Sequence, residues 1–362
     1  MTGVTVLNSG VDSLYLSASG QVIDGLTQGL SRMVEMASGE PVPFSFESAE
    51  PDMHLRLHGW RGYPVWISSP RFELCIGASK PFPAVYVQLH SAYIHAVGVE
   101  AAAQDAERLL LRHIMPKGFT TVVSRMDVYA DEQGWEPVHA DFHCFVCRGV
   151  RRRMYEVSRE LHGRGRRLSG FTFGAGDILA RVYDKTLETT LRGVTWPALM
   201  WEGRDPERPV WRVEFQYRRK ALSSFSIRGV GDALRGRQDL WDYGTRWLSL
   251  RRKGRHGDRD RWQEAEEWAA LRGAQLGSPR SHLVREHIRG ADELRLVRGF
   301  VGYATSLAAV GNTGELAGVL SREVPAAQRY LVSTGQRFDA IVERKRSRWI
   351  TLPAAPQTEV AS

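Results

Sequence analysis

The chain has 362 residues, a length that suggests about two domains, and 43% hydrophobic and 25% charged residues are ordinary values for a globular protein. These values exclude a disordered or collagen-like chain. Three cysteines are too few, and too odd in number, for a disulfide framework, which predicts a reducing cytoplasmic setting. The apolar stretch 300–310 is about half of the roughly 20 residues that a bilayer helix needs, and the N-terminus lacks a signal-peptide pattern, so we expect no membrane partner.

The net charge is +8, and most of the excess lies in one segment. Residues 148–260 contain 26 basic and 14 acidic residues, a net of +12, which leaves −4 for the rest of the chain. A basic segment on a nearly neutral body indicates an anionic partner, with nucleic acid ahead of a membrane surface. A solvated charged surface is the alternative. The expected DNA contacts are Arg125, Arg151, Arg152, Arg153, Arg164, Arg166, Arg167, Arg212, Arg218, Arg251, Arg252 and Lys253.

Strand and helix patterns follow one another along the chain. Strand patterns occupy residues 4–17, 54–67, 72–76, 85–96, 119–130, 171–174, 178–185 and 210–218. Helical patterns occupy residues 23–34, 100–113, 154–161, 233–250, 262–271, 282–289, 292–310 and 325–346. Strands first and helices last predict an α+β fold, with an antiparallel-rich sheet core, flanking helices and a C-terminal helical appendage. We expect one domain over residues 1–275 and a helical region over residues 276–362.

Three of the strand patterns place polar residues at every second position, so the polar residues of each strand share a face. SRMDVYAD carries Arg125, Asp127, Tyr129 and Asp131, ILARVYDK carries Arg181, Tyr183 and Lys185, and VWRVEFQYRR carries Arg212, Glu214, Gln216 and Arg218. If the strands are neighbours, the three faces form one surface. Its carboxylates suit Mg²⁺ or Mn²⁺, and its cations suit the charge of a phosphodiester in its transition state. A ladder of cross-strand ion pairs is the alternative.

These motifs, in this order and with FTFGAG before the second, resemble the replication initiation factor family. That family includes rolling-circle plasmid replication initiators and the related relaxases of conjugative elements. GVDSLYLS and VQLHSAYIHAVG resemble it too, and the resemblance spans residues 10–275. It implies a metal-dependent enzyme that binds DNA at an origin of replication or transfer and attacks one phosphodiester with a tyrosine. A second copy of the chain, a helicase and other replication proteins are the further partners to consider.

The resemblance also implies roles for individual residues. Asp127 and Glu214, with Asp131, match the metal-side carboxylates, while Arg181 and Lys185 match phosphate contacts. The family's tyrosine is expected shortly before the second motif, where this chain has FTFG at 171–174. We therefore assign the nucleophile to Tyr183. The alternatives are a tyrosine from elsewhere in the chain, and a non-catalytic DNA-binding protein on the same scaffold that acts as a plasmid or phage regulator.

Two further groups of residues have structural and functional interpretations. Cys144 and Cys147 form a CxxC motif near two histidines, but no second pair follows at zinc-finger spacing, so we expect buried cysteines rather than a zinc site. The tryptophans of the helical patterns, Trp241, Trp247, Trp262 and Trp268, could stack on bases, but their helical spacing favours core packing.

Overall fold

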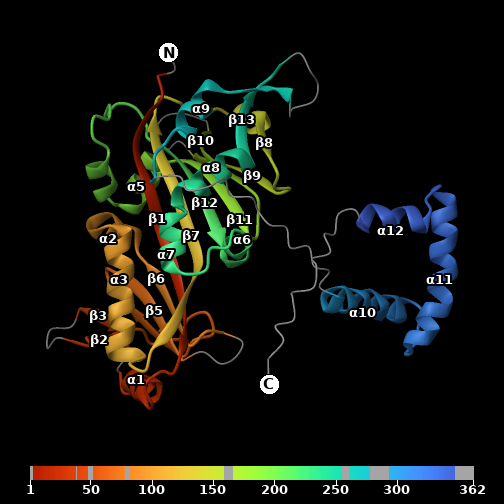
Figure 1. Cartoon of the computed structure of the whole chain (residues 1–362), viewed down its shortest axis with the longest axis horizontal. Helices are drawn as coiled ribbons and strands as arrows, with labels where there is room; N and C mark the ends of the chain where they lie inside the picture. Colours follow the sequence, from red (N-terminus) through yellow and green to blue (C-terminus); the bar gives the residue numbers. More distant parts are fainter. Residues whose placement is uncertain are drawn as a thin grey trace, which may run out of the picture. The chain divides into compact units, whose positions relative to one another are not determined.

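The computed structural model of the chain describes residues 3–37, 39–47, 52–77, 82–158, 166–254, 261–277 and 293–346. The chain divides into two compact units, Met1–Arg285 and Glu286–Ser362 (Figure 1). Within the described residues, the first unit combines a large antiparallel sheet with helices, and the second unit is helical. The predicted α+β fold with C-terminal helices is therefore confirmed. The helix expected over residues 282–289 lies outside the described residues.

The main sheet has eleven strands within the described part of the chain, and every neighbouring pair in it is antiparallel. In sheet order the strands are β2 (Val42–Phe44), β3 (Met53–Leu55), β4 (Val65–Ser68), β5 (Phe72–Ile76), β6 (Val85–Leu89), β1 (Thr5–Gly20), β7 (Phe119–Gln133), β12 (Trp211–Arg218), β11 (Ile178–Asp184), β10 (Arg166–Phe173) and β9 (Arg152–Ser158). The long strands β1 and β7 pair along most of their length, so they join the two halves of the sheet.

Helices and a smaller sheet complete the first unit. The helices are α1 (Leu26–Glu35), α2 (Ser91–Val97), α3 (Val99–Leu109), η1 (Leu110–Ile114), α4 (Asp141–Cys144), α5 (Lys185–Arg192), η2 (Trp196–Met200), α6 (Arg219–Ser224), α7 (Val230–Arg235), α8 (Arg237–Trp247) and α9 (Glu266–Arg272). The smaller sheet has the order β14-β13-β8, formed by β14 (Gln263–Glu264), β13 (Leu248–Arg252) and β8 (Phe145–Cys147).

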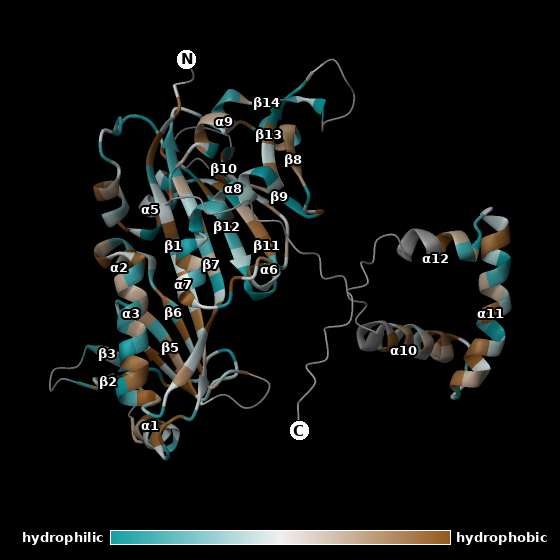
Figure 2. Cartoon of the chain, viewed as in Figure 1, coloured by the Kyte–Doolittle hydropathy of each residue, from teal (hydrophilic) through white to brown (hydrophobic). Residues whose placement is uncertain are grey.

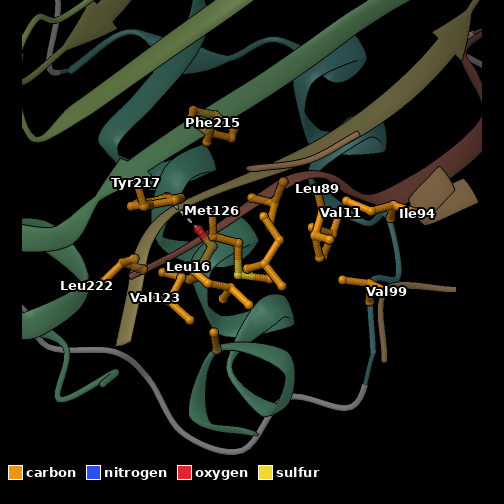
Figure 3. Close-up of a cluster of buried hydrophobic side chains, with 14 of the residues drawn as sticks. Val11, Leu16, Leu89, Ile94, Val99, Val123, Met126, Phe215, Tyr217 and Leu222 are labelled. Carbon is orange, nitrogen blue, oxygen red and sulfur yellow. Dashed lines mark hydrogen bonds between the residues drawn. The ribbon is translucent and has the colours of Figure 1, made fainter. Parts of the chain in front are cut away.

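One face of the main sheet is apolar and forms the core with the helices. Figure 3 shows side chains from strands β1, β6, β7 and β12 meeting those from the helices, among them Leu16, Met126 and Phe215 from strands and Val99 from α3. Helix α8 lies so close to β12 that a Cβ on Gly244 would come within 2.6 Å of the Phe215 ring. Glycine at this position therefore permits the close approach of helix and sheet. In Figure 2, hydrophilic residues interrupt the hydrophobic ones along the long strands, because alternate residues face away from this core.

Several expected elements differ from the structure. The strand expected over residues 54–67 forms only at its ends, as β3 and β4, and the helix expected over residues 325–346 is divided between α11 (Leu316–Ser333) and α12 (Phe338–Arg346). Residues 154–161 were predicted as a helix, but residues 152–158 form β9, which pairs with β10. The strand expected over residues 85–96 ends at Leu89, and residues 91–97 form α2. The helix expected over residues 233–250 is divided into α7 and α8, and its last residues form β13 against β8. In each case pairing with a strand distant in sequence, or a turn of the chain, overrides the local periodicity.

The expected core tryptophans and cysteines are mostly enclosed. Trp241, Trp247 and Trp268 are buried, and Trp262 is half-buried. Cys75 is buried, while Cys144 and Cys147 are half-buried free thiols. These tryptophans are thus part of the packing, as their helical spacing favoured.

The second unit is described by α10 (Glu293–Val310), α11 (Leu316–Ser333) and α12 (Phe338–Arg346). Helices α10 and α11 contact each other, and Pro325 lies inside α11. Across the parts of the chain that the structure describes, no helix combines the length and apolarity that a membrane crossing requires.

Candidate functional site

The three strands with alternating polar residues are neighbours in the sheet, in the order β7, β12 and β11. Their register places Glu214 of β12 opposite Tyr129 of β7 and Arg181 of β11, and Gln216 opposite Asp127. Residues directly opposite one another in a sheet point to the same side. The polar face of each strand is therefore continuous with the next, and it lies on the side opposite the apolar core.

A cavity of about 900 Å³ opens on this polar face. It is lined by most of the residues that the sequence singles out as catalytic or metal-binding, and by walls from β1, α2, β9, β10, α5 and η2. The sequence-predicted residues in the lining are Arg125, Asp127, Arg181, Tyr183, Lys185 and Glu214. The fold thus brings together, in one cavity, cations, two carboxylates and a tyrosine that come from distant parts of the chain.

Glu214 is the centre of a hydrogen-bonded group in this cavity. The Tyr183 hydroxyl donates to Glu214 Oε2 at 3.1 Å, and Arg181 Nη1 donates to Glu214 Oε1. The second guanidinium nitrogen of Arg181 donates to Gln216 Oε1 at 3.0 Å, which fixes the plane of the guanidinium. Burial raises the pKa of Tyr183 well above its ordinary value, and the negative charge of Glu214 adds to the shift. Tyr183 is therefore a neutral phenol whose proton points at a carboxylate oriented by an arginine.

Asp127 has a different environment from Glu214. Its carboxylate accepts two hydrogen bonds from Arg125, one of them 2.8 Å long to Oδ1. Burial nevertheless raises the pKa of Asp127 to about 7, and the charge of Glu214 contributes to the rise. The Arg125 guanidinium lies 4.6 Å from the centre of the Tyr15 ring. Near neutral pH, Asp127 is thus able both to hold and to release a proton.

Lys185 reaches the cavity because a helix begins there. Asp184 is the N-cap of α5, and its Oδ1 accepts a hydrogen bond from the Leu187 backbone N–H at 2.8 Å. Lys185 is the first residue of the helix, and its Nζ lies 2.6 Å from Glu188 Oε2 and 5.6 Å from the centre of the Tyr183 ring. The sequence YDK therefore ends a strand, caps a helix and places a cation beside the tyrosine.

The roles predicted for Asp131 and Arg212 are wrong in this structure. Both are enclosed, with Arg212 only 1% exposed, and Arg212 Nη2 donates to Asp131 Oδ2 at 2.8 Å. Arg212 also bonds to Asp12 and lies 3.8 Å from the centre of the Tyr129 ring, while Trp201 Nε1 donates to Asp131 at 2.8 Å. Asp131 does not line the cavity, so it is not placed as a metal ligand beside Asp127. Arg212 does not reach the surface, so it is not placed to contact DNA.

The predicted divalent cation would have to share carboxylate oxygens that already accept hydrogen bonds. Both oxygens of Asp127 accept from Arg125, and the oxygens of Glu214 accept from Arg181 and Tyr183. Among the residues that the structure describes, no group of three or more His, Cys, Asp or Glu side chains could hold a metal ion. In this arrangement the donors do not fit Mg²⁺ or Mn²⁺, since each carboxylate is neutralised by a guanidinium. The metal remains a prediction from the sequence.

The remaining arginines expected to contact DNA fall into two groups. Arg151, Arg153, Arg218 and Lys253 are exposed. Four others form bonds within the chain: Arg152 to the Phe145 carbonyl, Arg167 to Asp184, Arg251 to the Trp262 carbonyl, and Arg252 to Asp141 and Glu267. Arg164 lies outside the described residues, and Arg166 is placed only as part of β10. A second cavity, of about 560 Å³, is lined by Arg148, Arg151 and residues 174–176.

Sequence reasoning missed several residues of the cavity, of which Asp12 is the most important. Asp12 lies at a bulge of β1, between Val11 and Ser13, and accepts a hydrogen bond from Ser91 Oγ at 2.8 Å. Burial alone would raise the pKa of Asp12, but the Arg212 guanidinium, together with His95, Lys185 and Ser91, outweighs burial and holds the pKa well below its ordinary range. A bulge shifts the alternation of side chains between the two faces of a strand, so strict alternation could not have predicted on which face Asp12 lies. Its position inside GVDSLYLS was the available signal.

Tyr155 was missed for a different reason. It belongs to β9, which was predicted as a helix, and it is 45% exposed at the cavity. Gly170 of β10 lies between it and Tyr183 in the register. A Cβ on Gly170 would come within 2.8 Å of the Tyr183 Cβ. The cavity therefore contains two tyrosines on one row of the sheet.

No protein-family model matches this chain, and no curated protein sequence matches it. One solved structure to which the chain is similar is that of the rolling circle replication initiator protein from Geobacillus stearothermophilus. The match covers 75% of this chain and 96% of that chain, with 16% sequence identity and a TM-score of 0.42. A likeness of this size leaves the function to be argued from the site itself.

Proposed function

We propose that this chain is a DNA-binding initiator or relaxase that nicks one strand at an origin of replication or transfer through attack by Tyr183 on a phosphodiester. The observation that carries the proposal is the hydrogen-bonded group of Tyr183, Glu214 and Arg181 at a cavity lined by further cations. A nucleophile within reach of a base, with the base oriented by a third group, is the arrangement that nucleophilic catalysis requires.

The raised pKa of Tyr183 decides how its hydroxyl must react. Since the phenolate is scarce at neutral pH, the proton has to leave as the oxygen attacks, and Glu214 is positioned to accept it. The bond between Tyr183 Oη and phosphorus forms while the bond from phosphorus to the 3′-oxygen breaks. The product is a 5′-phosphotyrosine and a free 3′-OH that could prime DNA synthesis.

The leaving 3′-oxygen needs a proton, and Asp127 is the acid in this proposal. With a pKa of about 7, a substantial fraction of Asp127 is protonated at neutral pH. Glu214 gains one proton and Asp127 loses one, so the step is balanced. The guanidinium groups of Arg125 and Arg181 lie beside the same cavity and stabilise the negative charge of the transition state. Nicking should therefore slow as the pH rises above about 7, since Asp127 is then ionised before the step.

DNA would be held near the cavity by exposed cations. Arg151, Arg153 and Arg218 lie on strands of the same sheet or beside them and are available for phosphate contacts. Such contacts supply affinity and register rather than sequence reading. A second copy of the chain and a helicase are proposed as partners on the family resemblance alone.

The test uses supercoiled plasmid that carries the native origin. We expect the full-length protein to produce open-circular DNA and a protein–DNA adduct that resists SDS. Tyr183→Phe should abolish the adduct and leave DNA retardation unchanged, whereas Tyr155→Phe, the matched change at the other tyrosine of the cavity, should keep both. Loss of the adduct in Tyr155→Phe alone would move the nucleophile to Tyr155.

Two further arms of the same experiment test the rest of the proposal. Incubation with Mg²⁺, with Mn²⁺ and with a chelator shows whether nicking depends on a divalent cation, as the family resemblance implies. DNA that is retarded but never cut, under all three conditions, would contradict the nicking proposal and support the non-catalytic DNA-binding protein.

A further inference from the structure

The polar face of the sheet continues past the cavity into a strip of aromatic side chains. In the half of the sheet that contains β4, β5 and β6, the apolar face packs against α1 and α3, and the opposite face carries Trp66 of β4 and Tyr86 of β6. Trp60, just before β4, and Tyr15 of β1 extend the row. We call these four residues, Trp60, Trp66, Tyr86 and Tyr15, the aromatic strip. Its members on β4 and β6 are half-buried, so they remain in contact with solvent.

The rings of the aromatic strip are arranged face to face or edge to face. Trp60 and Trp66 are stacked, with ring centroids 5.3 Å apart and planes 26° apart. Tyr86 meets the edge of Trp60 at 6.4 Å and lies 6.1 Å from Tyr15. Together the rings cover Cys75, which is buried beneath them on the same face. Flat rings on an open sheet face are surfaces on which bases can stack.

Arginines lie over these rings. The Arg61 guanidinium is 4.3 Å from the centre of Trp60 and 5.4 Å from that of Tyr86, and Arg56 is 5.4 Å from the centre of Trp66. Arg125 lies over Tyr15 and also lines the cavity. The carboxylate in this row is Glu73, which is held by Trp66 Nε1 at 2.6 Å and lies 3.3 Å from His90 Nε2. The surface therefore combines aromatic planes with an excess of positive charge.

The backbone at Arg61 has an uncommon conformation. Trp60 and Tyr63 pair through two backbone hydrogen bonds of 3.1 and 3.0 Å around the two-residue turn Arg61-Gly62. Both central residues have positive φ, 55° at Arg61 and 84° at Gly62, a pattern that favours Asn-Gly. An arginine in this conformation is uncommon. The turn holds the guanidinium over Trp60 and Tyr86 although asparagine would suit the backbone better.

We propose that the aromatic strip binds single-stranded DNA, with bases stacked on the layer that the Arg56 and Arg61 guanidinium groups form over Trp60, Trp66 and Tyr86, and with phosphates held by the same two positive charges. The strand would pass over Arg125, which covers the buried Tyr15, into the cavity. From β4 to β7 there are four strand-to-strand steps, or roughly 19 Å, which fits a short run of nucleotides. This inference goes beyond nicking, because binding on the strip requires no reaction at Tyr183.

The test measures the affinity of the full-length protein for a fluorescent oligothymidine of about 15 nucleotides and for a duplex of equal length, by fluorescence anisotropy. Arg61→Asn should weaken oligothymidine binding about fivefold, and Trp60→Ala about tenfold, with smaller effects on the duplex. Arg61→Asn is the sharper variant, since Asn-Gly suits the turn and loss of binding cannot then be attributed to a lost fold. Arg32→Asn, at an exposed arginine of α1, is the control with the same change of charge and should stay within twofold.

The outcomes separate this inference from the proposed function. Tyr183→Phe should bind oligothymidine like the wild type. Binding on the aromatic strip can therefore be confirmed in a protein that does not nick DNA, and it can be contradicted in a protein that does. Unchanged oligothymidine binding in Arg61→Asn and Trp60→Ala would overturn the inference. So would a loss of equal size in Arg32→Asn, or tighter binding of oligouridine than of oligothymidine.

Discussion

In two regions of one sheet face, the positively charged side chains have different kinds of partner. On β7, β12 and β11, guanidinium groups are bound to carboxylates of the same or the neighbouring strand, and Arg212 with Asp131 is enclosed completely. On the aromatic strip, Arg56 and Arg61 lie over rings, and Arg61 is exposed while Arg56 is half-buried. The cations of the first region are thus paired with carboxylates, whereas Arg56 and Arg61 of the second lie over rings and donate to the hydroxyl groups of Ser68 and Tyr86. Substitution of the enclosed Arg212 should therefore affect stability, and substitution on the aromatic strip should affect binding.

The largest effect is expected at Arg212. Replacing it with methionine leaves the buried Asp131 and the half-buried Asp12 without this cation, which should lower the free energy of unfolding by about 3–5 kcal/mol. Denaturant unfolding followed by tryptophan fluorescence measures this change, since ten of the eleven tryptophans belong to Met1–Arg285. Arg218→Ala, at the exposed end of the same strand, is the control and should change stability by less than about 0.5 kcal/mol. Equal effects of the two substitutions would contradict the structural role of Arg212.

A second test uses the pH dependence of stability. The pKa of Asp127 is about 7 in the folded chain and ordinarily 3.8, so between these values the folded state holds a proton that the unfolded state has lost. The resulting stabilisation is complete below about pH 3.8 and is lost as the pH rises through about 7. Asp127→Asn cannot ionise, so its stability relative to the wild type should rise by roughly 4 kcal/mol as the pH is raised through this window.

Urea unfolding at a series of pH values measures the two curves. Glu132, whose pKa burial raises to about 8, contributes in the same direction, and Glu132→Gln shows how much of the slope is not due to Asp127. Parallel curves for the wild type and Asp127→Asn would mean that Asp127 is ionised in the folded chain, and the proposed acid of the nicking step would be lost with it.

Much of the charged region could be predicted from the sequence, because alternation along a long strand is a local property. Arg125 and Asp127, like Arg181 and Tyr183, share a face whatever the strands pair with. The same alternation cannot tell Asp127 from Asp131, which share that face, although one lines a cavity and the other is enclosed with Arg212. That difference depends on which residues lie opposite and above them, and such contacts come from distant parts of the chain.

The aromatic strip could not be predicted for a related reason. Trp66 and Tyr86 are separated by 20 positions, and each lies in a short strand whose apolar alternation only indicates a buried side. The tryptophans that the sequence did offer for stacking, such as Trp241 and Trp268, are core residues of α8 and α9. Rings and arginines of the strip are brought together by strand pairing between distant segments, and a single sequence does not show that pairing.

A smaller effect is expected at Glu73, the carboxylate of the aromatic strip's row. Glu73→Gln keeps an acceptor for Trp66 Nε1 but removes its charge, so the free energy of unfolding should fall by about 1 kcal/mol. Glu100→Gln, at an exposed ion pair with Arg237, is the control and should cost at most about 0.5 kcal/mol. Removing a negative charge from the strip should at the same time tighten oligothymidine binding. Weaker binding in Glu73→Gln would instead make the Glu73–Trp66 contact part of the ligand site's geometry.

The smallest effect, and the most specific, concerns the two substitutions of Arg61. Both Arg61→Asn and Arg61→Ala remove the cation above Trp60, so both should weaken oligothymidine binding alike. They differ in the backbone, because asparagine tolerates a φ of 55° and alanine does not, and Arg61→Asn should be more stable by about 1 kcal/mol. Thermal unfolding of the two variants measures the difference. If Arg61→Ala bound oligothymidine more weakly than Arg61→Asn, in proportion to its lower stability, the effect of Arg61 on binding would act through folding. The distinction between a region that stabilises the fold and a region that binds a ligand would then be wrong at Arg61.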